Sequence, residues 1–217
     1  LSMDITYFTY LSQQAGGLND TMFNNDPFLS NRARNWFNVD WSLYNLKFEH
    51  KFNDLKILSF NLFGLNAVRN ALGFRVNRVD QVDSNDVRDL IKGDFNNFGF
   101  ESKFLSNYNL FNLKSIFVIG SKLYLSNNYS KQGPGSEFSD ADFNFYNNEF
   151  PNYVNQSDYK YPNQNISIFG ETIIKLSDNL SLTPGFRLEF INTKAQGTYE
   201  RIVQDAAMNV ISHDTIY

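Results

Sequence analysis

Apolar and polar side chains alternate with a period of two over the stretch Asn31–Phe52. One parity carries Phe37, Val39, Trp41 and Leu43, and after a slip of one residue the other parity carries Tyr44, Leu46, Phe48 and Phe52. This alternation predicts a β-strand with one apolar and one polar face. Because a one-residue slip turns every side chain over, we expect a β-bulge between Leu43 and Asn45.

The same pattern predicts six further strands along the chain. They are Met3–Leu11, Leu55–Ala67, Phe95–Leu105, Leu113–Leu125, Gln164–Leu176 and Leu180–Thr193. The remainder, from Lys194 to Tyr217, is polar, and only Asn209–Tyr217 carries a weak strand signal. Several of these strands are longer than is usual in globular domains, where about three to ten residues are typical.

Short turns and long loops alternate between the predicted strands. The short turns are Asn53-Asp54, Asn107–Asn112 and Ser177–Asn179, and the long loops are Gln13–Arg34, Arg69–Asp94 and Asn127–Asn163. Outer-membrane barrels have short periplasmic turns and long extracellular loops. The pattern therefore favours a transmembrane β-barrel, and a soluble secreted β-sandwich would require the long loops to be divided between both ends.

The composition agrees with a barrel and narrows the chemistry. Of 217 residues, 22 are Phe and 12 are Tyr, as in the lipid-facing bands and aromatic girdles of barrels. The mean hydropathy is -0.40 and no apolar run approaches twenty residues, which excludes a transmembrane helix but not a membrane-spanning strand. A net charge of -4 argues against nucleic acid as a partner.

Charged residues indicate which face of the strands meets lipid. Leu180–Thr193 has apolar residues on one parity, and Arg187 and Glu189 on the other. An arginine in hydrocarbon costs about 2–4 kcal/mol at the bilayer midplane, so the apolar parity should face lipid. We therefore expect the lumen-facing set Glu171, Lys175, Arg187 and Glu189. Pro184 lacks a ladder donor and should mark a bulge or an edge-like site.

The number of strands leaves two architectures open. Seven or eight strands suffice only for the smallest closed barrels, and an open sheet would leave unsatisfied edges in lipid. Either the chain closes as a small outer-membrane barrel with an adhesive or structural role, for which the aromatic Tyr217 is weak support, or more strands lie outside it. The chain begins at Leu1 within a predicted strand. We therefore expect a segment of a longer protein.

Several motifs carry a resemblance to a known family. The first block comprises Gln13–Asp20, Phe23, Asp26-Pro27, Ser30 and Arg32–Phe37, and matches follow at Arg69–Phe74, Arg88–Leu90, Gly99–Glu101 and Leu182–Glu189. These runs resemble the barrel region of TonB-dependent outer-membrane receptors of the ferric-citrate type, particularly those of the Bacteroidota. Ala15 stands where that family would have proline. The resemblance implies an all-β antiparallel transmembrane barrel of about twenty-two strands, of which residues 1–217 form an internal segment of about seven, without the plug domain.

The resemblance also implies a function. It is active transport of an iron chelate, such as ferric citrate or another siderophore, across the outer membrane of a Gram-negative bacterium. The implied partners are outer-membrane lipid and lipopolysaccharide, the chelate itself, and the TonB energy complex acting through the missing plug. We expect no cofactor besides the transported ferric chelate.

Loop arginines are the candidate ligand-binding residues. Guanidinium groups match the carboxylates of an anionic chelate in a bidentate fork. The candidates are Arg32, Arg34, Arg69, Arg75 and Arg88. Alternatively, these arginines pair with loop aspartates (Asp20, Asp26, Asp80, Asp83 and Asp89) or meet lipopolysaccharide.

Catalytic and metal sites are not expected. His50 and His213 are the only histidines and the chain has no cysteine, so neither a Ser-His-Asp grouping nor a zinc-like site can be argued. Gly133-Pro134-Gly135 is a turn signal in a loop rather than a phosphate-binding motif. An enzyme is therefore not predicted.

Overall fold

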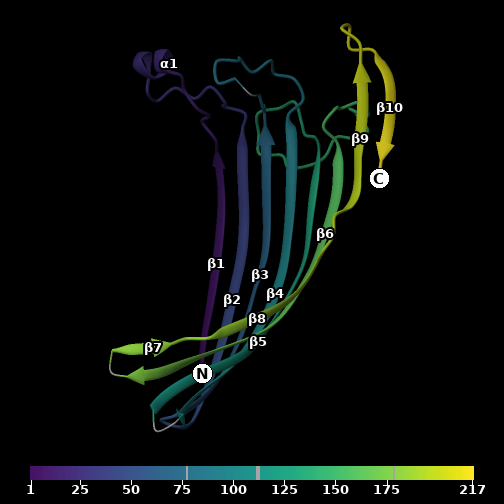
Figure 1. Cartoon of the computed structure of the whole chain (residues 1–217). Helices are drawn as coiled ribbons and strands as arrows, with labels where there is room; N and C mark the ends of the chain where they lie inside the picture. Colours follow the sequence, from purple (N-terminus) through teal and green to yellow (C-terminus); the bar gives the residue numbers. More distant parts are fainter. Residues whose placement is uncertain (77, 111–112, 178) are drawn as a thin grey trace.

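The computed structural model describes all residues except 77, 111–112 and 178, and it shows a curved antiparallel sheet (Figure 1). The strands are β1 (Ser2–Gln13), β2 (Trp36–Asn53), β3 (Lys56–Gly73), β4 (Asp89–Leu110), β5 (Leu113–Pro134), β6 (Ser157–Ser177), β7 (Leu180–Leu182), β8 (Gly185–Thr193), β9 (Gln196–Gln204) and β10 (Val210–Ile216). A helix, α1 (Asp20–Asn25), lies in the first long connection, where Asn19 caps it. Of the helices described, none has the length and apolar character needed to cross a membrane.

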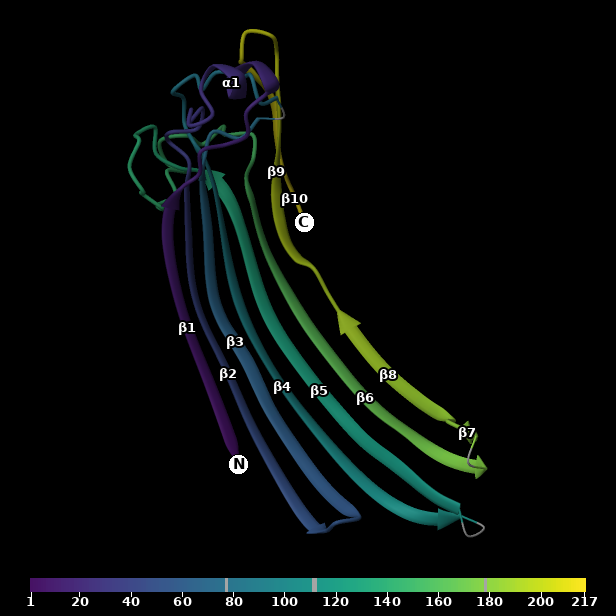
Figure 2. The same cartoon turned by 90° about the vertical axis from the view of Figure 1, so that its left-hand side faces the viewer.

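The strands follow one another across the sheet in the order β1-β2-β3-β4-β5-β6-β9-β10 (Figure 2). The long connections 14–35, 74–88 and 135–156 gather at one end, which we call the loop end (Figure 1). The short connection between β2 and β3, at Asn53-Asp54, lies at the opposite end, which we call the turn end. Residues 107–110 of the expected turn Asn107–Asn112 belong to β4 instead, and the rest of that turn, like residue 178 of Ser177–Asn179, lies outside the described residues. The expected gathering of the long loops at one end is therefore confirmed, and the short connection 205–209 between β9 and β10 also lies at that end (Figure 1).

A single interrupted path along β6 contains β7, β8 and β9. Successive parts of β6 pair with β7 through Ile174 and Leu182, with β8 through Gly170 and Phe186, and with β9 through Tyr159 and Gly197. The first interruption falls at Thr183-Pro184, as expected from the missing N–H of proline. The predicted strand Leu180–Thr193 is thus β7 and β8. In the polar remainder, the weak strand signal at Asn209–Tyr217 corresponds to β10, whereas β9 was not expected.

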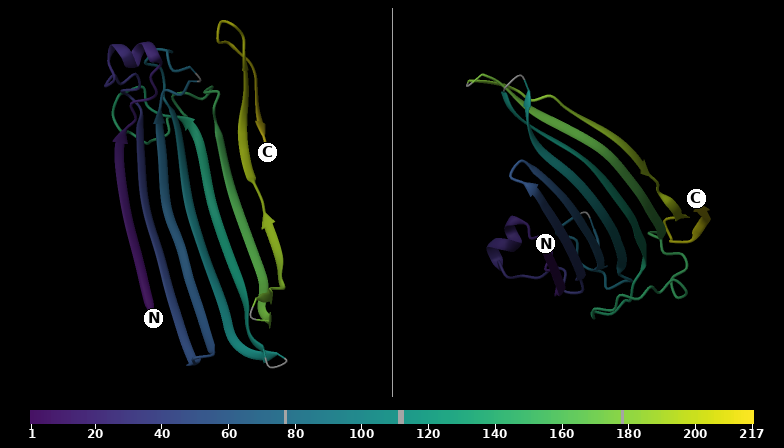
Figure 3. Two further views of the ribbon diagram at one scale, coloured as in Figure 1. Left: turned by 60° about the vertical axis from the view of Figure 1, so that its left-hand side comes forward. Right: turned by 90° about the horizontal axis from the view of Figure 1, so that it is seen from below.

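The sheet is an open wall. Among the described residues, β1 forms one edge, β7, β8 and β10 form the other, and the two edges do not pair with each other. Seen from below, the strands make an open arc in a single layer (Figure 3). The structure therefore shows neither the small closed barrel nor the two-layered sandwich, and it confirms an antiparallel barrel segment.

The expected bulge between Leu43 and Asn45 is absent. β2 pairs residue for residue with β1 and β3 through Leu43, Tyr44 and Asn45, and its register with β3 shifts only between Lys51 and Asn53. The side chains therefore keep their faces throughout the strand. The apolar residues therefore move from one face of β2 to the other at Leu43 and Tyr44, while the strand itself stays regular.

Each face of the sheet changes character at the same level. Face 1 is the set that includes Phe60, Phe100 and Leu188, and face 2 is the set that includes Glu101, Lys103 and Arg187. Toward the turn end, face 1 is apolar: Leu46, Phe48, Leu58, Leu62, Phe104, Phe117, Ile119, Leu123, Ile166, Ile168, Phe186 and Phe190. Toward the loop end, face 1 is polar: Asn38, Asp40, Asn66, Asn70, Lys92, Asp94, Asn96, Asn127, Lys131, Lys160 and Asn192. The boundary follows one register row, Tyr44, Gly64, Phe98, Leu125 and Gln164.

The length of the strands explains this boundary. A membrane-crossing strand needs about 9–11 residues, whereas β2 to β6 have 18 to 22. The turn-end half of each strand thus matches the hydrocarbon, and the loop-end half extends beyond it into water. The slip in parity marks a change of solvent along a regular strand.

The same change explains the errors in the predicted strand limits. β4 begins at Asp89 rather than Phe95, β5 ends at Pro134 rather than Leu125, and β6 begins at Ser157 rather than Gln164. The extra residues lie on the loop-end side of the boundary row, where face 1 is polar. A strand whose face meets water can carry Asn, Asp and Ser. These residues are typical of turns, so the sequence pattern predicts a loop there.

Arginine substitutions on β8 test the boundary. In the full-length protein, Leu188→Arg places a charge inside the apolar band of face 1 and should lower the free energy of unfolding by about 2–4 kcal/mol. Asn192→Arg, on the same face but in the boundary row itself, where Asn192 pairs with Gln164, places its charge at the edge of the apolar band and should cost no more than about 1 kcal/mol. Denaturant unfolding in phospholipid vesicles measures both, and equal effects would contradict the assigned boundary.

Candidate functional site

Arg34 joins all three long connections at the loop end. It is buried, and its guanidinium forms an ion pair with Asp83, with Nε 2.9 Å from Oδ2. Nη1 donates to the carbonyl of Glu137 at 2.7 Å, and Nη2 donates to the carbonyl of Asp86 at 3.1 Å. Burial opposes ionisation of Asp83, but hydrogen bonds from Arg34 and from the Asn85 N–H outweigh it and lower the Asp83 pKa.

Arg88, just before β4, fastens the third connection. Its side chain is fully buried, Nε donates to the Ser136 carbonyl at 3.0 Å, and Nη2 donates to the Ser136 hydroxyl. Nη1 donates to the carbonyls of Arg34 and Asp140 at 3.0 and 2.8 Å. These contacts occupy the planar donor fork with loop backbone.

Arg32 is also buried and holds the second connection. Its Nη1 donates to the Gln81 carbonyl at 3.1 Å, and its Nη2 donates to the Arg78 carbonyl at 3.2 Å. The guanidinium lies over the Phe74 ring, 5.3 Å from its centroid. Three of the five candidate arginines, Arg32, Arg34 and Arg88, therefore connect loops to one another.

Arg69 and Arg75 are exposed. Arg69 projects from face 2 of β3 and lies over the Phe95 ring, 5.7 Å from its centroid. In the part of the chain that the structure describes, its guanidinium has no carboxylate or carbonyl partner. The Arg75 side chain is 52% exposed, and its Nε lies 3.7 Å from Asp89. Both arginines line one hollow of 370 Å³, together with Gln14, Asn35, Phe37, Ala71, Leu72, Gly73 and Ile91.

Asp89 joins the exposed arginines to the loops. Its buried carboxylate accepts hydrogen bonds from Gln132 Nε2 at 2.8 and 3.1 Å and from the Tyr153 hydroxyl at 3.2 Å. Burial raises the pKa of Asp89, although the hydrogen bond from Gln132 and the charge of Arg75 act to lower it. Burial and the neighbouring Asp89 carboxylate raise the pKa of Tyr153. Two further hollows, of 460 and 570 Å³, share Phe74, Arg75 and Asp89.

We call Arg69, Arg75, Asp89, Gln132 and Tyr153 the vestibule site. Arg69 has no anionic partner among the described residues, and Arg75 is held only at 3.7 Å by Asp89. These two guanidinium groups suit an anionic ligand. The alternation pattern does not select Gln132 or Tyr153, because both lie inside the expected loop Asn127–Asn163. Continuing the alternation of Leu113–Leu125 would have placed Gln132 on a strand beside Asp89.

The four residues expected to face a lumen share face 2 in the turn-end half. Glu171 pairs with Gly185 in register, Lys175 with Ser181, and Arg187 forms an ion pair with Glu189 at 2.6 Å. Glu101 and Lys103 form another ion pair on this face. Face 2 therefore gathers charge of both signs at the level where face 1 is apolar.

The two histidines occupy separate surroundings. His50 contacts Phe52 edge-on with ring centroids 4.6 Å apart, and His213 Nε2 lies 2.9 Å from Glu200. Within the described ranges there is no group of three or more His, Asp or Glu side chains that could hold a metal ion.

Removing Arg88 should release the third connection. Arg88→Ala removes the donors to the carbonyls of Arg34 and Asp140 and to the Ser136 hydroxyl, at about 1–3 kcal/mol for a buried unsatisfied group, and leaves the Ser136 carbonyl only the backbone N–H of residue 88. Proteolysis within residues 135–156 of the full-length protein should accelerate at least severalfold. Arg78→Ala is the control, because Arg78 makes an exposed ion pair with Asp80, and such pairs contribute at most about 1 kcal/mol. Equal cleavage rates in the two variants would contradict this role of Arg88.

Comparisons with known proteins agree with this architecture. The family described as TonB dependent receptor-like, beta-barrel, matches residues 2–209. No curated protein sequence matches the chain. Among solved structures, the crystal structure of the ferric citrate transporter FecA in the unliganded form aligns with a TM-score of 0.66 and 13% identity, covering 99% of this chain and 29% of that one. At this identity the likeness concerns the fold, and the chain spans less than a third of the transporter.

Proposed function

The chain belongs to the TonB-dependent receptor family, and we propose that it forms part of the ligand-capturing wall of an outer-membrane receptor that imports an iron chelate such as ferric citrate. The proposal assigns the loop end to the extracellular side and the turn end to the periplasm, as is usual for this class of barrel. Face 1 then meets lipid and, beyond it, lipopolysaccharide. Face 2 lines the lumen, including Glu171, Lys175, Arg187 and Glu189.

The exposed guanidinium groups of the vestibule site carry this proposal. Arg69 has no anionic partner among the described residues, and Arg75 is only weakly engaged by Asp89 at 3.7 Å. Both lie on one hollow at the inner side of the loop end. An anionic chelate would supply carboxylates to these donors, and charge-assisted hydrogen bonds of this kind are among the strongest in proteins.

The buried arginines support the same site indirectly. Arg32, Arg34 and Arg88 are buried and donate mainly to loop carbonyls and to Asp83, so we assign them to positioning the loops that surround the hollow. We therefore restrict the proposed ligand contacts to Arg69 and Arg75. The other three candidates act on loop structure.

Transport requires parts outside this chain. In the proposed mechanism, the loops capture the chelate, and a plug coupled to the TonB energy complex then releases it inward. The family and its solved relative are transporters or receptors, which agrees with a protein that performs no catalysis. The ferric ion would be cargo within its chelate. The assignment to the ferric-citrate type of the Bacteroidota rests on the sequence motifs.

Neutralising both exposed arginines tests the ligand proposal. In the full-length receptor, Arg69→Gln with Arg75→Gln should weaken ferric citrate binding at least about tenfold, a loss of about 1.4 kcal/mol. Titration calorimetry measures the affinity. Arg78→Gln is the matched control, because it removes a loop arginine that is already paired with Asp80 and does not line the hollow. Unchanged affinity in the double variant would refute the assignment.

A further inference from the structure

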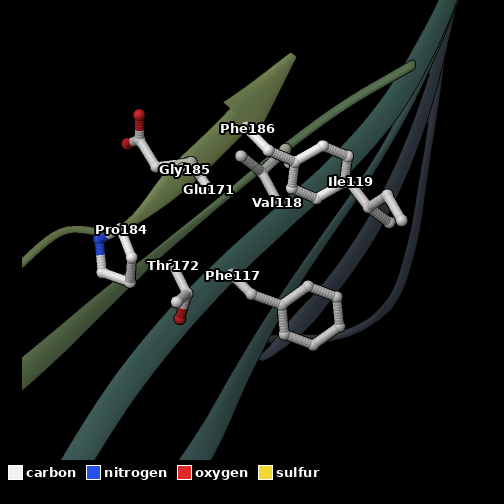
Figure 4. A pocket seen from close by; sticks show the side chains of 9 residues that line it. Phe117, Val118, Ile119, Glu171, Thr172, Pro184, Gly185 and Phe186 are labelled. Carbon is white, nitrogen blue, oxygen red and sulfur yellow. The ribbon is translucent and has the colours of Figure 1, made fainter. Parts of the chain in front are cut away.

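Face 1 is hollowed where β5, β6 and β8 run side by side. The groove has a volume of 360 Å³. Phe117 and Ile119 of β5 form one wall, Pro184 and Phe186 form the other, and Gly170 and Thr172 of β6 lie between them (Figure 4). The groove lies on the turn-end side of the boundary row, within the apolar band.

Two local features of the chain create this hollow. Gly170 has no side chain, and the Phe186 ring lies so close above it that an added Cβ would meet the ring at 2.8 Å. The path from β7 to β8 is interrupted at Thr183-Pro184, beside Thr172, where only the Pro184 carbonyl reaches the Thr172 N–H at 3.0 Å. The ladder is therefore open at the end of the groove nearest the turns.

The side chains that face the groove are apolar or paired. Thr172 Oγ1 lies 2.7 Å from the Tyr108 hydroxyl and donates to the Ile116 carbonyl at 3.1 Å. Glu171 belongs to face 2, and Figure 4 shows its carboxylate directed away from the Phe117 ring. The groove therefore suits an apolar occupant.

We propose that this groove holds an acyl chain of a phospholipid from the leaflet at the turn end. Its walls are continuous with the lipid-facing band of face 1, so hydrocarbon is the medium beside it. The groove opens at the Pro184 interruption toward the turns, which favours a lipid of that leaflet over lipopolysaccharide. This inference rests on the membrane placement of the sheet and not on the identity of the transported ligand.

Shape must hold the lipid in place. Lipid tails are as apolar as leucine, so burial in the groove gains no hydrophobic transfer free energy. Attraction comes from close contact with the phenyl rings and Ile119, which is lost when the volume is filled. Occupancy should therefore depend on the free volume of the groove.

Native mass spectrometry of the full-length receptor tests the site. The receptor is purified in mild detergent with equal small amounts of dipalmitoyl phosphatidylethanolamine and hexa-acylated lipid A. The unmodified receptor should retain the phospholipid, and Ile119→Trp, which fills the groove, should reduce the retained fraction about tenfold, or about 1.4 kcal/mol. Ile166→Trp is the control, because Ile166 is an exposed face 1 residue on β6 that does not line the groove.

A second variant keeps the test decisive if Ile119→Trp fails to fold. Phe186→Ala removes the ring that forms one wall, so the groove widens, its close contacts with the acyl chain are lost, and the phospholipid should also be released. Folding is checked by heat-dependent gel mobility. Equal retention by the groove variants and Ile166→Trp, preferential retention of lipid A, or no retained lipid would each overturn the proposal. Ferric citrate affinity should be the same in Ile119→Trp as in the unmodified receptor, which separates this result from the test of Arg69 and Arg75.

Discussion

The structure depends on a change of solvent halfway along its strands. In hydrocarbon, backbone groups must be paired within the protein and charged side chains must be kept from the lipid face. Where face 1 meets water, charged side chains are tolerated on it and water can pair with exposed backbone groups. Each of β2 to β6 meets both media, so face 1 is apolar toward the turns and carries Asn, Asp and Lys toward the loops.

The continuous ladder makes this change possible. The residues of the boundary row, from Tyr44 to Gln164, are paired directly across five strands, so all of these strands change at one level. A bulge in a single strand would have shifted its faces against those of its neighbours. Regular pairing instead carries the sheet beyond the membrane and raises the loops on a rigid wall.

Buried guanidinium groups organise the loops above that wall. Arg34 and Arg88 reach across the first, second and third connections and donate mainly to backbone carbonyls. A planar group with five donors suits this role, because one side chain satisfies several carbonyls of segments that have no ladder of their own. The exposed Arg69 and Arg75 lie beside this framework, so the proposed ligand site is built on fixed surroundings.

The sequence by itself determined the all-β class, the antiparallel barrel segment and the positions of the three long loops. Period-two alternation and the cost of charge in lipid act locally, so Leu188 and Arg187 reveal their faces without knowledge of their neighbours. Only the tertiary structure decided that the parity slip at Leu43 is a change of solvent, because this requires the register with β1 and β3. It also decided which arginines are buried and which are exposed. Burial depends on partners distant in sequence, such as Asp83 for Arg34 and Ser136 for Arg88, and composition cannot distinguish these arginines from Arg69.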